Sequence, residues 1–291
     1  MRDLYKTITE QIIAEFKAGV RPWLQPWSQT PGLNFPCNAV TGRPYSGINT
    51  LLLWRTRDHG WAQPRFLTFK QALEAGGHVR KGEHGSHIVF VKDAIRQTDE
   101  GDDEEPHRFR FLKSYVVFNL AQCDDLPDKL LTPPQGPNPH RRDASLDEFI
   151  TATGARIREE TTANQAFYRA SDDVIVMPSF KVFRGRPEYY AVLFHELVHW
   201  VGGPTRLDRQ LGDRFGIRAH AAEELIAEIG AAFLCAEFAI DGFVPDTAYI
   251  QHFLELLEND TRAIFTAASK AQAAVDFLRE QILKDNKDQA A

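Results

Sequence analysis

Residues 195–199 read His-Glu-Leu-Val-His, and this H-E-x-x-H pattern constrains the chain more than any other feature. On a helix, residues four apart lie on one face, so the imidazoles of His195 and His199 can bind the same metal ion. Glu196 then lies beside the ion, where its carboxylate can take a proton from a water molecule. The preceding run, 189–194, is apolar and lacks Gly and Pro. It predicts the buried helix that such a site needs.

The pattern predicts a hydrolytic metal centre, with Zn²⁺ or another divalent ion such as Mn²⁺ as cofactor and Glu196 as the catalytic base. A peptide bond is the usual target of such a site, so we expect a zinc-dependent metallopeptidase. The alternative is a buried helix whose two histidines are simply hydrogen-bonded within the core.

A third protein ligand must come from elsewhere in the chain, because a catalytic zinc keeps its fourth position for water. The best source is the helix predicted for residues 219–238, where Glu224 and Glu228 lie one turn apart on one face. We expect Glu224 to ligate the metal, as in gluzincin-like enzymes, and Glu228 to hydrogen-bond a ligand histidine. The spacing also allows the reverse assignment, or a solvated helix face.

Two neighbours of these glutamates, Glu223 and His220, have other expected roles. Glu223 points away from Glu224 around the helix, so we expect it to face solvent. His220 lies one turn before Glu224 on the same side, where it either stabilises an oxyanion or holds the helix end. The residues after His199, from Trp200 to Gly203, do not continue into the third histidine of a metzincin.

The bulk composition indicates a globular protein of ordinary make-up. The 291 residues are 43% hydrophobic and 25% charged, and no apolar run is long enough to span a bilayer. The N-terminus lacks the apolar segment of a signal peptide. The three cysteines are odd in number and far apart, which argues against a disulfide framework. We therefore expect a cytoplasmic protein without a membrane partner.

Charge is distributed unevenly along the chain. Residues 1–123 carry 16 Lys+Arg and 13 Asp+Glu, a net charge of +3, whereas residues 124–291 carry 18 and 27, a net charge of −9. Six acids of the first part lie in one run, 99–105. The basic first part and acidic second part indicate an anionic partner for the first.

Apolar spacing and breaker residues predict both helices and short strands. The predicted helices cover 3–18, 47–58, 69–75, 146–153, 186–201, 219–238, 247–258 and 261–283, and the predicted strands cover 86–91, 108–118, 165–170 and 173–177. The stretch 126–142 contains five prolines and is predicted to be neither helix nor central strand. The fold class is therefore α+β, with an N-terminal α+β domain (1–125), a proline-rich linker (126–144) and a zincin-like domain of a small sheet plus helices (145–291).

The N-terminal part interleaves aromatic and cationic residues. Four of the five tryptophans lie within the first 61 residues, among several arginines, and a glycine-rich segment follows at 76–85. Such a pattern can stack bases and hold phosphates of single-stranded nucleic acid, although Pro-Trp pairs can equally pack the core beneath a solvated charged face. The candidate contacts to single-stranded DNA are Arg21, Trp23, Trp27, Arg43, Tyr45, Arg55, Lys70, Arg80 and Lys81.

Several long motifs resemble those of the ArdC-type antirestriction proteins of conjugative plasmids. They are Pro22-Trp23, Pro26-Trp27, 41–49, 67–72, 79–83, 195–200 and 223–228. The resemblance implies a single-stranded-DNA-binding domain fused to a zincin-like metallopeptidase domain. His195, Glu196 and His199 match the zinc-peptidase motif directly, whereas two glutamates compete for the position of Glu224. His220 stands where the family often has Tyr.

The resemblance also implies a role in protecting incoming plasmid DNA from host restriction during conjugation. The expected partners are single-stranded DNA and a host protein substrate, such as a component of a restriction–modification system. Two alternatives remain open. One is a non-enzymatic protein that coats single-stranded DNA and holds a structural metal. The other is an acidic DNA mimic that blocks restriction enzymes through the run 99–105.

Overall fold

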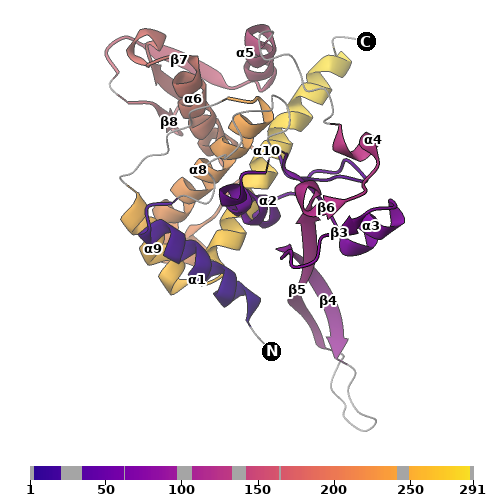
Figure 1. Cartoon of the computed structure of the whole chain (residues 1–291). Coiled ribbons are helices and arrows are strands. Elements are labelled where there is room, and N and C mark those ends of the chain that lie inside the picture. The colour runs from indigo at the N-terminus through magenta and orange to yellow at the C-terminus, as the bar shows by residue number, and fades with distance from the viewer. Residues whose placement is uncertain are drawn as a thin grey trace.

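The computed structural model describes residues 3–20, 35–61, 63–96, 107–132, 142–163, 165–240 and 249–288. It contains helices and small sheets in the mixed arrangement that the sequence predicts, and the α+β fold class is confirmed (Figure 1). The predicted contacts Arg21, Trp23 and Trp27 and the acidic run 99–105 lie outside the described residues.

The described residues of the N-terminal part form four α-helices, and side chains cap the first turn of two of them. They are α1 Leu4–Lys17, α2 Ile48–Trp54, α3 Phe69–Glu74 and α4 Asp128–Leu131. The side chain of Asp3 accepts hydrogen bonds from the first turn of α1, and Thr68 and Gln71 form a capping box on α3. The helix predicted for 47–58 ends at Trp54 and continues as a 3-10 helix over Arg55–His59.

The described strands of this part form a mixed four-stranded sheet and an antiparallel two-stranded sheet. They are β1 Cys37–Asn38, β2 Arg65–Leu67, β3 His78–Val79, β4 Ser86–Arg96, β5 His107–Asn119 and β6 Cys123–Asp124. The larger sheet has the order β1-β2-β5-β4, and β3 pairs with β6. β4 and β5 pair from Ser86↔Val117 to Arg96↔His107, so β4 runs five residues beyond its predicted end at 91. Apolar alternation weakens there in the sequence, and pairing with β5 extends the strand.

The C-terminal part is mostly helical and holds a three-stranded sheet. Its helices are α5 Arg142–Ala152, α6 Arg186–Val201, α7 Gly212–Phe215, α8 Ala219–Glu237, α9 Ile250–Asn259 and α10 Ala263–Asp288. Its strands are β7 Arg156–Glu160, β8 Phe167–Arg169 and β9 Val174–Pro178, in the order β7-β9-β8. The sequence predicted β8, β9 and the long helices, but missed β7, whose Arg-Ile-Arg-Glu-Glu sequence has one apolar residue.

The main hydrophobic core joins residues from both ends of the chain. Ile12 of α1 and Trp54 of α2 are buried with Phe194 of α6 and Phe233 of α8. The rings of Trp54 and Phe233 lie 5.6 Å apart, edge to face. In Figure 1, α1 lies beside α9, and the hydroxyl of Thr9 donates to the carbonyl oxygen of Thr261 at 2.7 Å. The helix that carries the H-E-x-x-H motif, α6, and its neighbour α8 are therefore braced by the N-terminal helices.

The prediction that no helix forms between 126 and 142 is wrong at its start. α4 occupies Asp128–Leu131, and Leu126 and Leu130 are buried in a small second core. Arg65 donates to the carbonyl oxygen of Leu130 at 2.8 Å and holds this turn against the sheet. The prolines in this stretch disfavour a helix, but burial of the neighbouring leucines stabilises one short helical turn. Residues 133–141 lie outside the described part, so the proposed domain boundaries stay a prediction.

Within the described residues, no helix combines the length and the apolar character that crossing a membrane requires.

Candidate metal centre

The helix α6 carries the H-E-x-x-H motif and is built to lie in the core. It begins after Gly185, has Pro187 in its first turn and ends at Val201, before the capping residue Gly202. Phe194, Leu197 and Val198 are fully buried along it. At Gly230 of α8, an added Cβ would lie 2.7 Å from a methyl carbon of Val198. Glycine therefore allows α6 and α8 to approach closely, and this brings the glutamates of α8 to the histidines of α6.

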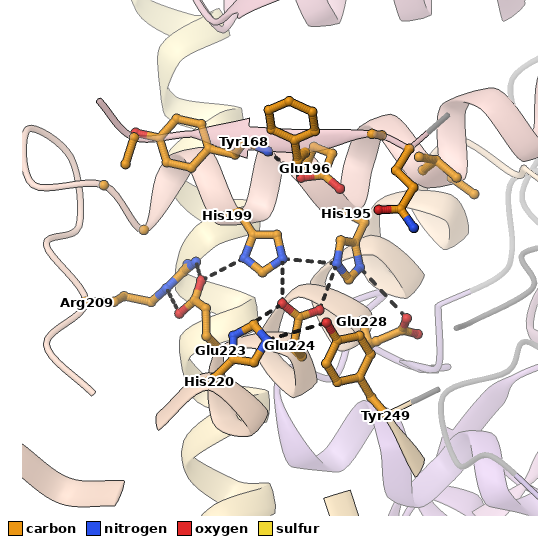
Figure 2. Close-up of a pocket in the computed structure, with 18 of the residues that line it drawn as sticks. Tyr168, His195, Glu196, His199, Arg209, His220, Glu223, Glu224, Glu228 and Tyr249 are labelled. Carbon is orange, nitrogen blue, oxygen red and sulfur yellow. Dashed lines mark hydrogen bonds and ion pairs between the residues drawn. The ribbon is translucent and has the colours of Figure 1, made fainter. Parts of the chain in front are cut away.

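His195, His199 and Glu224 converge on one point between the two helices (Figure 2). The two Nε2 atoms lie 3.0 Å apart. Glu224 Oε2 lies 3.4 Å from His195 Nε2, and its Oε1 lies 3.5 Å from His199 Nε2. One ligand atom of each residue fits within 4.8 Å of the others. Two imidazole nitrogens and one carboxylate form the donor set of a catalytic zinc site, so these residues fit a divalent ion.

Two further glutamates of α8 approach the outer nitrogens of the histidines. Glu223 Oε1 lies 3.1 Å from His199 Nδ1, and Glu228 Oε1 lies 3.8 Å from His195 Nδ1. A carboxylate at Nδ1 holds a neutral imidazole with Nε2 unprotonated, which is the form that binds a metal. Glu223 is within hydrogen-bond distance of His199, whereas Glu228 lies beyond that distance from His195, and Glu224 lies between the two imidazoles.

The expectation that Glu223 faces solvent is wrong. Its side chain contacts both His199 and Arg209, whose Nε donates to Glu223 Oε2 at 3.1 Å. Arg209 also donates to the carbonyl oxygen of Val198 at 2.6 Å. Helical spacing separated Glu223 from Glu224, but two histidines one turn apart present a surface wide enough to meet both. No sequence pattern signalled Arg209, because it lies in the loop between α6 and α7.

Electrostatics at the centre favour a bound cation. Burial opposes ionisation of Glu223, yet His199 and Arg209 outweigh it and lower the pKa of Glu223 to about 2. Burial likewise opposes the charged form of His195, but Glu224, Glu196 and Glu228 outweigh it and raise its pKa. The carboxylates therefore create a negative potential at the point where the three donor groups meet.

Glu196 lies on the side of α6 that faces the small sheet. Its side chain is largely buried, and its Oε2 accepts a hydrogen bond from the backbone N–H of Tyr168 at 2.8 Å. Tyr168 belongs to β8, an edge strand of the three-stranded sheet. The sequence motif located Glu196, but the backbone partner became visible only in the folded chain.

His220 lies at the rim of the centre, together with Tyr249. His220 Nδ1 is 3.8 Å from Glu224 Oε1, and the hydroxyl of Tyr249 is 3.4 Å from His220 Nε2. The side chain of His220 is 71% exposed, so it faces open space above the centre rather than the core. Tyr249, which the sequence did not single out, lies on the same rim (Figure 2).

A cavity of about 1200 Å³ opens beside these residues. Phe167, Val182 and Phe183 contribute apolar wall, whereas Arg184 and Arg209 contribute positive charge. The cavity is large enough for several residues of an extended peptide, and both Glu196 and the three donor groups line it.

The described DNA-contact candidates differ in how accessible their polar groups are. Arg55, the first residue of the 3-10 helix after α2, pairs with Glu15 of α1 at 2.6 Å, and Arg80 bonds to Glu83 and Asp124. Their guanidinium groups thus already have partners within the fold. The other described candidates are Arg43, Lys70 and Lys81, which are exposed, and Tyr45, which is half-buried. Trp54, one of the interleaved tryptophans, is fully buried and cannot stack on a base.

Comparison with known families and structures gives matches over nearly the whole chain. Residues 2–118 match the N-terminal domain of anti-restriction factor ArdC, and residues 144–270 match a zincin-like metallopeptidase family. The metal-free crystal structure of the antirestriction protein ArdC from plasmid R388 is 40% identical and covers 97% of this chain and 99% of its own, with a TM-score of 0.81. The Mn(II)-bound structure of that protein is 39% identical, covers 97% of this chain and 98% of its own, and has a TM-score of 0.75.

Two curated relatives are also similar. The protein y4eC of Sinorhizobium fredii (strain NBRC 101917 / NGR234) is 39% identical over 96% of this chain and 92% of its own length. The DNA primase TraC of Escherichia coli is 36% identical over 99% of this chain, which spans 28% of TraC.

Proposed function

This chain belongs to the ArdC family of antirestriction proteins, and from that premise we propose that it binds single-stranded DNA and carries a metal-dependent peptidase site that together protect incoming plasmid DNA during conjugation. The observation that carries the peptidase part is the convergence of His195, His199 and Glu224 beside Glu196, in a cavity of about 1200 Å³. The cytoplasm, where transferred DNA meets host restriction, is the proposed location.

His195, His199 and Glu224 would hold a divalent ion, Zn²⁺ or Mn²⁺, and Glu223 and Glu228 would orient the two imidazoles. When bound, such an ion supplies a Lewis acid that polarises a carbonyl group and lowers the pKa of a water molecule. The Mn(II) complex of the R388 protein supports a divalent ion in this family.

Glu196 is the catalytic base in this proposal. The backbone N–H of Tyr168 binds its Oε2, which fixes the carboxylate and leaves the other oxygen to accept a proton from the attacking water. The same oxygen can then pass the proton to the leaving amine. His220 and Tyr249, at the rim, can donate hydrogen bonds to the oxygen of the carbonyl as it becomes negative.

The DNA-binding part is supported by the basic N-terminal sequence and by similarity to a DNA primase, TraC. The proposed peptidase substrate is a host protein such as a component of a restriction–modification system. Coating of the entering strand and cleavage of the host protein would then both prevent the restriction enzyme from cutting the entering DNA.

Substituting Glu196→Gln tests the proposal, because it keeps the shape of the side chain and removes the base. Hydrolysis of a fluorescently labelled unfolded protein in the presence of Zn²⁺ or Mn²⁺ should fall about 10²- to 10⁴-fold, with unchanged binding of Mn²⁺ and single-stranded DNA. Glu148→Gln, an exposed change on α5, is the matched control and should keep full activity.

Protection of plasmid DNA in a conjugation assay completes this test. Loss of protection in the Glu196→Gln variant supports the peptidase role. Full protection would contradict it and would favour a non-enzymatic protein that coats DNA and holds a structural metal.

A further inference from the structure

The β4–β5 hairpin extends far beyond the sheet to which it belongs. β2 pairs with β5 at two positions, Phe66↔Asn119 and Leu67↔Phe118, whereas β4 and β5 continue together to Arg96↔His107. Figure 1 shows the hairpin projecting away from the helical body. A two-stranded ribbon of this length exposes much of its surface to solvent. The types of its exposed side chains therefore indicate what the surface can bind.

One face of the hairpin is rich in aromatic rings and cations. Residues directly opposite each other on antiparallel strands share a face, and every second residue returns to it. Three such pairs follow one another: Ile88↔Tyr115, Phe90↔Lys113 and Lys92↔Phe111. We call the face formed by these six residues the platform.

The base of the platform is firmly attached to the fold. Ile88 is buried with Val117, Leu53 and Phe66 in a separate small core, and Trp61 and Tyr115 pack at its margin. Trp61 also stacks on His59, with ring centroids 4.5 Å apart and planes 11° from parallel. The aromatic surface thus begins at the body of the protein and continues outward along the hairpin.

The outer part of the platform exposes one large apolar residue, Phe90, beside two exposed lysines. Phe90 is 45% exposed and meets Tyr115 edge to face, with ring centroids 5.5 Å apart. Lys113 Nζ lies 5.3 Å from the centre of the Tyr115 ring, and Lys92 is exposed next along the same face. A phenylalanine held in place and open to solvent is available for stacking.

The opposite face of the hairpin is directed toward the helices instead. Val89 is buried in the main core, and the side chain of Asn49 accepts from its N–H at 2.8 Å and donates to its carbonyl oxygen at 2.9 Å. Val91 and Leu112 line a groove against α10. Beyond Ile88, which packs on Leu53 of α2, the platform is therefore the face that is turned away from α10.

The two strands of the hairpin carry a net positive charge, whereas the run 99–105 that connects them carries six acids. β4 and β5 contain five Lys and Arg residues and one Asp. Single-stranded nucleic acid is recognised by aromatic rings on which bases stack and by cations that track the phosphates. A DNA duplex hides the faces of its bases, so exposed rings beside cations match an unpaired strand better than a duplex.

We propose that single-stranded DNA binds along the platform, with bases stacking on Phe90 and Tyr115 and phosphates contacting Lys92 and Lys113. This assignment rests on the proposed DNA-binding function and names its surface. None of these four residues was among the contacts predicted from sequence, although Tyr45, which was, packs at the same small core.

Fluorescence anisotropy with a labelled oligothymidylate tests the assignment in the full chain. Phe90→Ala should weaken binding about tenfold, because it removes one stacking ring, whereas Phe90→Tyr should retain it. Val91→Ala is the matched control, since Val91 lies on the opposite face of the same strand and is 55% exposed. It should bind like the unchanged protein.

The cations are tested through the salt dependence of binding. Lys92→Gln with Lys113→Gln should reduce the slope of log K against log salt concentration by about 1.4, because each phosphate contact on a single strand contributes about 0.7. Lys6→Gln with Lys129→Gln removes the same charge from exposed sites on α1 and α4 and should leave the slope unchanged. Binding of Mn²⁺ checks that every variant is folded.

The outcomes separate this assignment from the function on which it rests. If the unchanged protein binds single-stranded DNA and the platform variants bind equally well, the platform is excluded while the DNA-binding function stands. If the unchanged protein does not bind the oligonucleotide at all, both fail. Equal affinity for a blunt duplex would also overturn the platform, because stacking on a duplex is blocked.

Discussion

The metal centre and the hairpin platform differ in what determines their residues. At the metal centre, two histidines must lie one turn apart and a carboxylate must face both, so coordination chemistry fixes both residue type and spacing. On the platform, any aromatic ring beside any cation can serve, and the residues meet only because β4 pairs with β5. A strict chemical requirement leaves a pattern in sequence, whereas a tolerant one becomes visible only after folding.

The largest expected effect is the loss of Mn²⁺ affinity at the metal centre. Glu224→Ala removes the carboxylate that lies within 3.5 Å of both Nε2 atoms, so Mn²⁺ affinity measured by calorimetry should fall by more than about 100-fold. Single-stranded-DNA binding should stay unchanged, because Glu224 belongs to the C-terminal helices.

Glu148→Gln serves as the control for a surface glutamate, and it should bind Mn²⁺ normally. A Glu224→Ala protein that still binds Mn²⁺ tightly would contradict Glu224 as the third ligand. Loss of DNA binding in the same variant would break the separation between the two regions.

The next effect concerns the carboxylate that sequence reasoning missed. Glu223→Gln leaves His199 with a weaker partner at Nδ1 and frees Arg209, so metal affinity should fall about 10- to 100-fold. An additional measurement, circular dichroism of the metal-free protein, distinguishes positioning from misfolding. Unchanged affinity in a folded variant would exclude Glu223 as an orienting residue.

Most of the metal centre could be predicted from the sequence. Periodicity placed α6 and α8 to within one residue at each end, and Glu196, His195, His199 and Glu224 came from one motif and one helix face. The sequence did not predict three other contacts of the centre. Glu223 reaches His199 through the packing of α8 on α6, Arg209 comes from a loop, and Tyr168 contributes only its backbone N–H. Such contacts depend on tertiary geometry, which local spacing does not encode.

The N-terminal part was harder to predict for a physical reason. Tryptophan and arginine serve equally in a core, an ion pair or a nucleic-acid contact, as buried Trp54 and paired Arg55 illustrate. The alternation in residues 108–115 is visible in the sequence, but the platform residues of β4 lie 19 to 27 positions before the residues they face, from Lys92↔Phe111 to Ile88↔Tyr115. Strand pairing, rather than composition, makes them one surface.

An intermediate effect is expected where the hairpin joins the body. Asn49→Ala leaves the N–H and carbonyl oxygen of Val89 without their side-chain partner, in a buried setting, which should cost about 2 kcal/mol of unfolding free energy. If the hairpin supports DNA binding, DNA affinity should fall as well, while Mn²⁺ affinity stays constant.

Urea denaturation measures the stability change, and Asn259→Ala, which removes an exposed bond to the carbonyl oxygen of Glu255, is the matched control. A stability equal to that of the control would mean that water replaces Asn49 at the edge of β4. In that case the hydrogen bonds between Asn49 of α2 and Val89 of β4 would contribute little to the free energy of unfolding.

The smallest effect lies at the far end of the metal helix and depends on pH. Tyr190 of α6 is buried and donates to Asp147 of α5 at 2.8 Å, and burial together with that carboxylate raises its pKa from 10.0 to about 12. A raised pKa means that this contribution to stability is complete below pH 10 and is lost as pH rises through 12. Tyr190→Phe should therefore cost about 1–2 kcal/mol at pH 8, and its stability should approach that of the unchanged protein near pH 12. Urea midpoints across this range measure the difference, and a constant gap would show that Tyr190 does not couple α5 to the metal helix through its proton.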